Sequence, residues 1–147
     1  WNQLLSTVSS YPGGWYYNLS TPVGAPSERV IYRPVVYGGV ILFTTFIPNN
    51  DICGYGGSSS LFALNYLTGT ANNAPVIGKS GSEILKKQAL GSGMASGVAL
   101  HIIATETGGA SNDIEKAYIQ MSTGVIVQAN VTTAHQKSGA TSWRETK

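Results

Sequence analysis

The sequence predicts an all-β protein built from antiparallel sheets, and its composition carries this prediction. The 147 residues include 18 glycines and eight tyrosines, and β-branched residues are frequent. Tyrosine and β-branched side chains favour strands, whereas glycine favours the tight turns that join short strands. Only 11% of the residues are charged while 42% are hydrophobic, so the chain can build a core and is not disordered by composition.

Charge and hydropathy argue against nucleic-acid binding and against a membrane span. Nine basic and seven acidic residues give a net charge of +2, and the largest basic cluster is the pair Lys86-Lys87. Nucleic-acid-binding domains carry basic patches or stripes, so no nucleic acid is expected as a partner. The longest apolar stretch, Val40 to Ile47, is much shorter than the ~20 residues of a transmembrane helix and suits a buried strand. We therefore expect no membrane span.

Residues 1–27 are predicted to contain one short strand between two irregular stretches. Residues 1–14 are expected to be irregular or to form a short helix around Leu4. The aromatic run 15–19 predicts a short strand, because aromatic side chains pack well on a pleated surface. The prolines and glycine of residues 20–27 predict a loop.

The clearest element is a hairpin. Two β-rich runs, Glu28 to Tyr37 and Val40 to Ile47, are separated only by Gly38-Gly39, which suits a two-residue turn with positive φ at both positions. Pro34 interrupts the first run and fits either a position whose amide is not needed for strand pairing or the start of a strand. Pro48 ends the second run.

The middle of the chain alternates loops and strands. Residues 49–60 form a Gly/Ser/Asn-rich loop that is long enough for a binding role. A strand is predicted over 60–66, followed by a turn at 67–69 and a mostly irregular stretch over 70–82. Residues 83–90 could form a short helix by composition, although glycines lie close on both sides.

The last part of the chain predicts a strand and a second hairpin. Residues 97–105 form an apolar strand candidate, and 108–113 a turn. Residues 117–121 and 125–131 then form a hairpin across Ser122-Thr123-Gly124. The tail after residue 131 is polar except for Trp143.

Two strand-turn units resemble each other. Leu61 to Asn65 is followed by Thr68-Gly69, and Lys116 to Gln120 by Thr123-Gly124. Strand units at a fixed period are a signature of β-propellers, but a β-sandwich that reuses one turn chemistry explains the two copies almost as well. A whole propeller needs at least four blades of about four strands, so this chain would supply about two to three blades.

Several motifs follow one another between residues 14 and 147. They are Gly14-Trp15-Tyr16, Glu28-Arg29-Val30-Ile31, Arg33-Pro34-Val35-Val36, the run from Gly38 to Pro48, the run from Gly56 to Asn65, Thr68-Gly69, Gly97-Val98, Ala117-Tyr118-Ile119-Gln120, Ser122-Thr123-Gly124 and Ser142-Trp143-Arg144-Glu145. Their order resembles the C-terminal portion of the PilY-type proteins of bacterial type IV pili.

This resemblance implies a fold and a domain organisation. The corresponding domain of that family is a modified β-propeller, so we expect a partial propeller. The chain would be a single module, irregular over 1–14 and β-rich over 15–147, and the C-terminal fragment of a larger propeller domain. The chain begins at Trp1 without a methionine, which fits a processed or excised segment.

The resemblance also implies a function. PilY-type proteins are exported, act in pilus assembly, are associated with the pilus tip and in several cases mediate adhesion. We therefore expect an extracytoplasmic, cell-surface location. Expected partners are minor pilins or other pilus subunits, or the missing part of the parent chain, with a host or surface ligand in addition.

The expected contact sites are a loop and a closing segment. The candidate contact loop contains Asn49, Asn50, Asp51, Cys53 and Tyr55, of which Tyr55 is an aromatic residue with a polar handle. Cys53 is the sole cysteine, so it is either a buried or free thiol or pairs with a cysteine elsewhere in a parent chain. Trp143 and Arg144 are candidates for closing the sheet onto a neighbour.

The sequence offers little chemistry for catalysis. The Thr-Gly units also resemble blades of quinone-dependent dehydrogenases, but the two aspartates, Asp51 and Asp113, form no paired carboxylates and no calcium constellation. His101 falls in an apolar strand and His135 in the polar tail, so neither suggests a catalytic triad or a zinc site. We expect no catalytic, cofactor-binding or metal-ligating residues, no cofactor and no enzyme activity.

Two other functions are compatible with these features. Exposed aromatic residues and Asn-rich loops also suit a carbohydrate-binding β module. Unpaired strand edges also suit a purely structural subunit of a surface filament, in which neighbouring subunits cover the edges.

Overall fold

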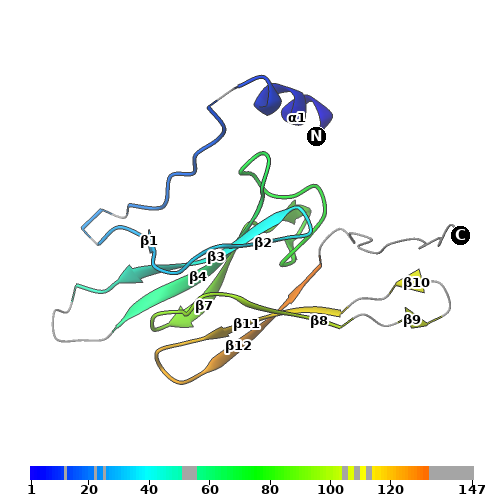
Figure 1. Ribbon diagram of the computed structural model, residues 1–147. Helices are drawn as coiled ribbons and strands as arrows, with labels where there is room; N and C mark the ends of the chain where they lie inside the picture. Colours follow the sequence, from blue (N-terminus) through cyan, green and yellow to red (C-terminus); the bar gives the residue numbers. More distant parts are fainter. Residues whose placement is uncertain are drawn as a thin grey trace, which may run out of the picture.

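In the computed structural model, the described part of the chain forms two packed antiparallel sheets, two short two-stranded ribbons and one short helix (Figure 1). The structure describes residues 1–11, 13–21, 23–24, 26–50, 56–103, 106–107, 110–111 and 114–132. The helices and strands of these residues are α1 (Asn2–Ser9), β1 (Arg29–Val30), β2 (Val35–Tyr37), β3 (Val40–Pro48), β4 (Gly57–Asn65), β5 (Lys79–Ser80), β6 (Glu83–Ile84), β7 (Lys87–Ser92), β8 (Ala99–Ile103), β9 (Glu106–Thr107), β10 (Ala110–Ser111), β11 (Ile114–Gln120) and β12 (Ile126–Val131).

The larger sheet has the order β1-β3-β4-β7, and β2 pairs with β3 beside β1. The smaller sheet has the order β12-β11-β8, and two further ribbons are formed by β5 with β6 and by β9 with β10. Each of these pairings is antiparallel. The prediction of an all-β, antiparallel fold is therefore confirmed, whereas the division into propeller blades stays a prediction.

The centre of the fold is the pair β3 and β4, whose register runs from Val40 opposite Asn65 to Pro48 opposite Gly57. Successive strand residues point to opposite faces, and here both faces are apolar. Leu42 and Leu61 point to the inner face, whereas Phe43 and Phe62 point to the outer face, where their rings stack at 5.0 Å. This ribbon therefore needs cover on both sides.

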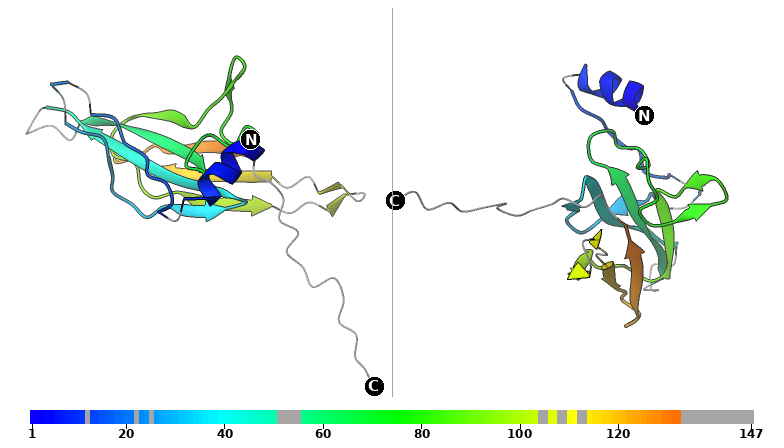
Figure 2. Two further views of the ribbon diagram at one scale, coloured as in Figure 1. Left: turned by 90° about the horizontal axis from the view of Figure 1, so that it is seen from above. Right: turned by 90° about the vertical axis from the view of Figure 1, so that its right-hand side faces the viewer.

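The smaller sheet covers the inner face, as the two layers in Figure 2 show. Ala117 and Ile119 of β11 are fully buried there, and Ala129 and Val131 of β12 are nearly so. The main core lies between the sheets, and Val76, Ile77, Ala95 and Val98 from the connecting segments complete it.

Residues 15–19, here named the cover segment, lie on the outer face. Trp15, Tyr17 and Leu19 pack against Phe43, Phe62 and Leu64, while the Tyr16 side chain between them is 85% exposed. The alternation is that of a strand, but the segment belongs to no sheet. The predicted strand over 15–19 is therefore wrong: the segment packs through side chains onto a face whose backbone groups are already paired.

The sequence predicted both tight hairpins correctly. Gly38 and Gly39, between β2 and β3, have φ of 55° and 80°, as a turn with two positive φ values requires. The pairing of β11 with β12 confirms the second hairpin. The strand predicted over 97–105 occurs as β8, and its residues 104–105 lie outside the described residues. Of the turn predicted over 108–113, Ala110 and Ser111 form β10, and the other residues lie outside the described part.

Two expectations for the middle of the chain are wrong. The loop predicted over 49–60 is shorter, because Gly57–Ser60 belong to β4; Ser59 is buried and its hydroxyl donates to the carbonyl of Gly93 at 2.7 Å. The alternative of a helix over 83–90 fails because β7 pairs with the edge of β4. Pairing in the tertiary structure outweighs the local helix propensity there.

The glycines of the two Thr-Gly turns both have a positive φ but differ in their surroundings. The Asn65 side-chain oxygen accepts hydrogen bonds from the amides of Leu67 and Thr68 at 3.0 and 3.3 Å. Gly69 then has a φ of +66° and lies directly under the Trp15 indole, whose nitrogen donates to the carbonyl of Tyr66 at 2.9 Å. Gly124 has a φ of +85°, and a Cβ at that position would meet no atom within 4 Å.

This difference gives a matched pair of substitutions. Both Gly69→Ala and Gly124→Ala place a Cβ in the left-handed region, which costs about 1–2 kcal/mol. We expect Gly69→Ala to cost at least 1 kcal/mol more, in the range of about 1–3 kcal/mol for overpacking, because its Cβ overlaps the Trp15 ring. Chemical denaturation of both variants measures the two losses, and equal losses would show that Trp15 does not pack on Gly69 in solution.

An ion pair fixes the start of β1 to the outer face of the sheet. The Glu28 carboxylate, whose side chain is 1% exposed, lies 2.9 Å from the ammonium group of Lys87 on β7. It also accepts hydrogen bonds from the Thr45 hydroxyl at 2.5 Å and the Ser20 amide at 3.3 Å. Burial raises the pKa of Glu28, but the hydrogen bonds from Thr45, Lys87 and the Ser20 amide and the positive charge of Lys87 lower it by more, so the pKa of Glu28 lies below the ordinary value of a glutamate.

The lowered pKa predicts acid-dependent stability. A group with a depressed folded-state pKa stabilises the fold above its unfolded pKa of about 4.3, and this contribution is lost as the pH falls through the folded value. At pH 7 we expect Glu28→Gln to lower the free energy of unfolding by about 1–3 kcal/mol, because hydrogen bonds to a charged group are lost.

Denaturation of the wild type and of Glu28→Gln between about pH 7 and pH 3 tests this prediction. The difference between the two proteins should be constant above about pH 5 and shrink at lower pH. Glu83→Gln on β6 is the matched control, because Glu83 is exposed, and it should follow the wild type. A difference that does not change with pH would mean that the Glu28 charge is not what stabilises this contact.

Candidate protein-interaction site

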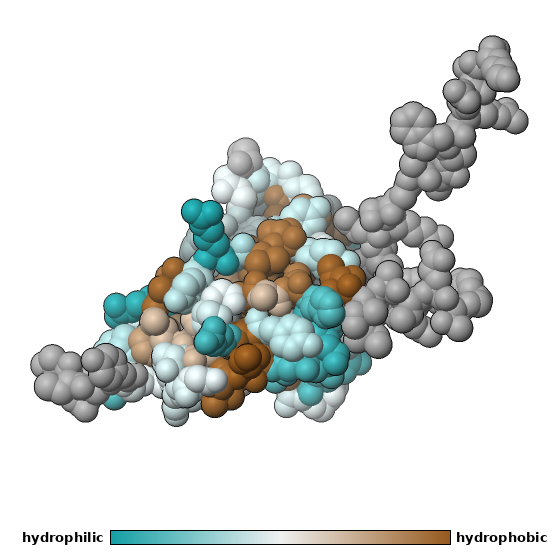
Figure 3. Space-filling model, turned by 60° about the horizontal axis from the view of Figure 1, so that its bottom comes forward, coloured by the Kyte–Doolittle hydropathy of each residue, from teal (hydrophilic) through white to brown (hydrophobic). Residues whose placement is uncertain are grey.

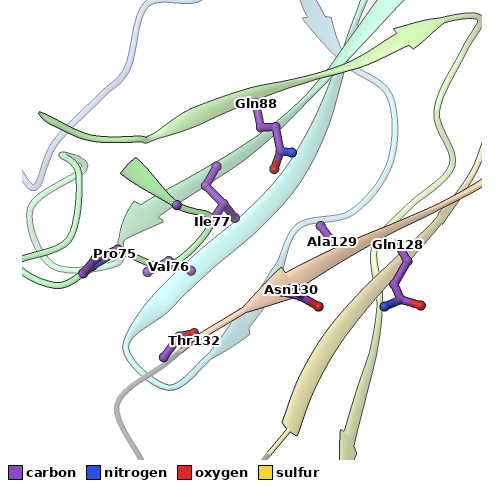
Figure 4. A pocket seen from close by; sticks show the side chains of 9 residues that line it. Pro75, Val76, Ile77, Gln88, Gln128, Ala129, Asn130 and Thr132 are labelled. Carbon is purple, nitrogen blue, oxygen red and sulfur yellow. The ribbon is translucent and has the colours of Figure 1, made fainter. Parts of the chain in front are cut away.

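A groove lies on the flank of the molecule where both sheets end, between β7 of the larger sheet and β12 of the smaller sheet (Figure 4). Its volume is about 410 Å³. Its lining comes from the segment before β5, from β7 and from the end of β12, and consists of Pro75, Val76, Ile77, Gly78, Gln88, Gln128, Ala129, Asn130 and Thr132.

The groove exists because the two sheets differ in width. Gln88 on β7 pairs with Leu61, so it lies on the same inner face as this core residue. Whereas Leu61 is fully buried, Gln88 is exposed, since β12 is the last strand of the smaller sheet on this side. The polar side chain of Gln88 therefore lies at a position that a further strand of the smaller sheet would cover.

The floor of the groove is apolar and its walls are polar but uncharged. Val76, Ile77 and Ala129 of the floor are all less than 10% exposed and belong to the main core. Gln88, Gln128 and Asn130 carry carboxamides, and each carboxamide both donates and accepts hydrogen bonds. Among the described residues that line the groove, none is charged. The arrangement suits a neutral partner that offers both donors and acceptors.

The backbone of β12 on the groove side is open. The Thr132 amide donates to the carbonyl of Val76 at 3.0 Å, on the side of β12 that faces away from β11. Backbone groups point to the same side at every second residue, so those of Gln128 and Asn130 face the groove as well. Within the described part of the chain, no hydrogen bond joins them to another segment on that side.

A second exposed surface lies on the opposite flank, along β1 and β2. Val30, Ile31, Tyr32 and Val36 are each at least 40% exposed. Beside them is an apolar hollow of about 200 Å³ between the cover segment and the sheet. The residues that line it are Trp15, Tyr17, Leu19, Val30, Pro34, Ile41 and Phe43.

Apolar residues form separate patches on one face of the molecule. On the face in Figure 3, several apolar patches are separated by polar residues. Val125 and Ile126, in the hairpin of β11 and β12, are 56% and 66% exposed. This face therefore offers several separate apolar contact areas.

The structure describes only part of the predicted contact sites. Asn50 donates from its side chain to the carbonyl of Gly24 at 2.9 Å, and the Asn49 amide donates to Gly56 at 3.2 Å, so both residues hold the base of their loop. The other predicted contact residues, Asp51, Cys53 and Tyr55, and the predicted closing residues Trp143 and Arg144 lie outside the described residues.

Sequence reasoning did not find the groove. Gln88 fell in a stretch that could have been helical, and nothing in the sequence placed it beside Gln128 and Asn130. A usable signal existed only in Gln128, Asn130 and Thr132, polar residues that alternate with apolar ones in a predicted strand. Of the two histidines, His101 is exposed on β8 at the other end of the smaller sheet, and His135 lies outside the described residues.

The described residues contain neither a cluster of metal ligands nor a helix that could span a membrane. Among them, no group of three or more His, Cys, Asp and Glu side chains lies close enough to hold a metal ion. Their helix is too short and too polar to cross a membrane.

Comparison with known proteins gives a partial similarity. One type IV pilus biogenesis factor PilY1 homolog of Xylella fastidiosa is 41% identical over 58 residues, which are 38% of the chain, and a second from the same organism is 36% identical over 69 residues, 46% of the chain. The matches cover 5% of each relative, so the chain spans only a small part of the curated relatives it matches. No family model and no solved structure matches. The chain thus contains a region similar to a small part of these two proteins, which are named as type IV pilus biogenesis factors.

Proposed function

We propose that the chain is a non-catalytic, extracytoplasmic module that acts in type IV pilus biogenesis and adhesion through contacts with other proteins. The observation that carries this proposal is the similarity to two PilY1 homologs. The partners are minor pilins or other pilus subunits, or the remaining part of a parent protein. The partial propeller belongs to the same proposal, because the larger and the smaller sheet would each correspond to a blade.

The geometry supports protein contacts better than small-molecule chemistry. The groove between β7 and β12 lies along strand edges and has no charged side chain among the described residues that line it, and the opposite flank exposes Val30, Ile31 and Val36. Exposed apolar side chains beside polar ones are typical of contact surfaces between proteins. Carbohydrate binding gains no support from the groove, because none of its lining residues is aromatic.

The function is tested in a bacterium whose encoded protein contains this chain. Substituting Ile31→Glu and Val36→Glu together places two charges on the exposed β1–β2 flank, and desolvating such charges opposes association. We expect surface pili, counted by electron microscopy and by shearing, to fall by about tenfold, equivalent to about 1.4 kcal/mol of lost association.

Two controls make the result interpretable. Glu83→Gln changes an exposed residue elsewhere and should leave piliation unchanged, and immunoblots must show equal amounts of all variants. In addition, residues 15–132 are replaced by a flexible linker. Normal piliation in the linker protein would contradict a role of this module in pilus biogenesis altogether.

A further inference from the structure

We propose that the groove between β7 and β12 accepts an extended, uncharged peptide segment of a partner protein, which adds to β12 as a fourth strand of the smaller sheet. The inference rests on the proposed function for the biological source of the peptide, but its geometry stands on the groove alone.

The first argument is that β12 is an unprotected edge. Natural edge strands carry charged residues, prolines or bulges that prevent pairing with another chain. The sequence of β12, Ile126–Val131, contains no charged residue and no proline. The β1–β2 flank, by contrast, carries Arg29 and Pro34, and β7 begins with Lys87 and has an irregular register against β4. The β8 edge (Ala99–Ile103) lacks charged residues and proline as β12 does, so it is the groove beside β12, not the edge alone, that selects β12.

The second argument is the direction of the backbone groups. The hydrogen bond from Thr132 to Val76 is already the first rung of a ladder on the open side of β12. The 75–78 segment does not continue along β12 past Thr132. The backbone groups of Gln128 and Asn130 therefore face the groove, two residues apart, as pairing with an added strand requires. An incoming strand would continue this ladder.

The third argument is the width of the two sheets. Gln88 lies on the inner face of β7 without a strand of the smaller sheet opposite it. A strand added to β12 would lie about 4.8 Å from it and so below β7. It would cover the floor formed by Val76, Ile77 and Ala129, and Gln88 would reach its backbone as a donor or acceptor.

The lining also defines the peptide. Residues that point to the floor meet Val76, Ile77 and Ala129, so small or β-branched apolar side chains fit there. Residues that point outward lie beside Gln128 and Asn130, so hydroxyl or amide side chains fit there. A charged side chain would find no counter-charge in the lining. The expected sequence therefore alternates Val or Ala with Ser or Thr.

The test uses the full chain and a capped peptide of about eight residues in which Val alternates with Ser and Thr. Amide hydrogen exchange is followed by NMR in the free protein and with the peptide at about 1 mM. We expect exchange at Gln128 and Asn130 to slow by at least about tenfold, because both amides become hydrogen-bonded. The amide of Ile102, on the other edge of the smaller sheet, should not change.

A matched pair of proline variants tests the edge. Asn130→Pro removes an amide that faces away from β11, so the pairing with β11 can persist. Ile102→Pro removes the equivalent outward amide on β8, which pairs with the other side of β11. We expect Asn130→Pro to weaken peptide binding by at least about tenfold and Ile102→Pro to leave it within about twofold.

A change in the peptide keeps the test valid if a proline variant does not fold. N-methylation of alternate peptide residues on the pairing edge should abolish binding, whereas N-methylation of the other residues should not. If 1 mM peptide does not slow amide exchange at Gln128 and Asn130, the proposal is wrong. Binding would then be weaker than a Kd of about 1 mM, which corresponds to a binding free energy of about −4 kcal/mol. The proposal would also be overturned by equal loss of binding with both proline variants, or by slow exchange of Gln128 and Asn130 in the free protein, which would show that another segment of the chain already occupies the edge.

The results separate this inference from the proposed function. If the peptide does not bind but the linker protein lacks pili, strand addition is wrong and the role in pilus biogenesis stands. If the peptide binds and the linker protein is normally piliated, the groove is a peptide site and the proposed role is wrong.

Discussion

The pairing of β3 with β4 is the constraint on which the rest of the structure depends. Nine residue pairs in register fix which side chains point to each face, and a shift by one residue would reverse them all. Because Leu42 and Leu61 point one way and Phe43 and Phe62 the other, neither face can be left in water. The smaller sheet covers the first face and the cover segment covers the second.

The two faces are covered by different physical means. The smaller sheet buries Ala117 and Ile119 against the inner face in an apolar contact between two pleated layers. The cover segment has no backbone pairing, so specific polar contacts supplement its aromatic side chains. The Trp15 indole bonds to a turn carbonyl, and Glu28, farther along, is held by Lys87 and Thr45. The attachment of the chain around Glu28 therefore depends on charge, whereas the main core is apolar.

The same unequal layers create the surface that a partner can use. The core between the sheets is closed only where each strand of one sheet packs against a strand of the other. The smaller sheet ends at β12, so none of its strands covers β7. This leaves Gln88 exposed above an apolar floor and leaves the edge of β12 open. The partner proposed for this surface is an extended peptide segment that would add to β12 and cover the floor of the groove.

The sequence by itself determined the features that depend on neighbouring residues. Alternating apolar residues with Gly38-Gly39 between them specified the β2–β3 hairpin, and Ser122 to Gly124 specified the turn of the second, because turn geometry and strand preference are local properties. The order of motifs also indicated the relation to pilus proteins. Of the predicted contact sites, however, only Asn49 and Asn50 fall among the described residues, where they hold a loop base.

Only the tertiary structure decided which segments became strands and which surface remained open. Residues 15–19 have the alternation of a strand but lie on a face, and 87–92 became a strand because an edge of β4 was available. The groove joins residues about 40 positions apart, Gln88 and Gln128, whose proximity depends on how the two sheets pack. No local pattern encodes the width of one sheet relative to another, since that difference arises only when distant strands pair.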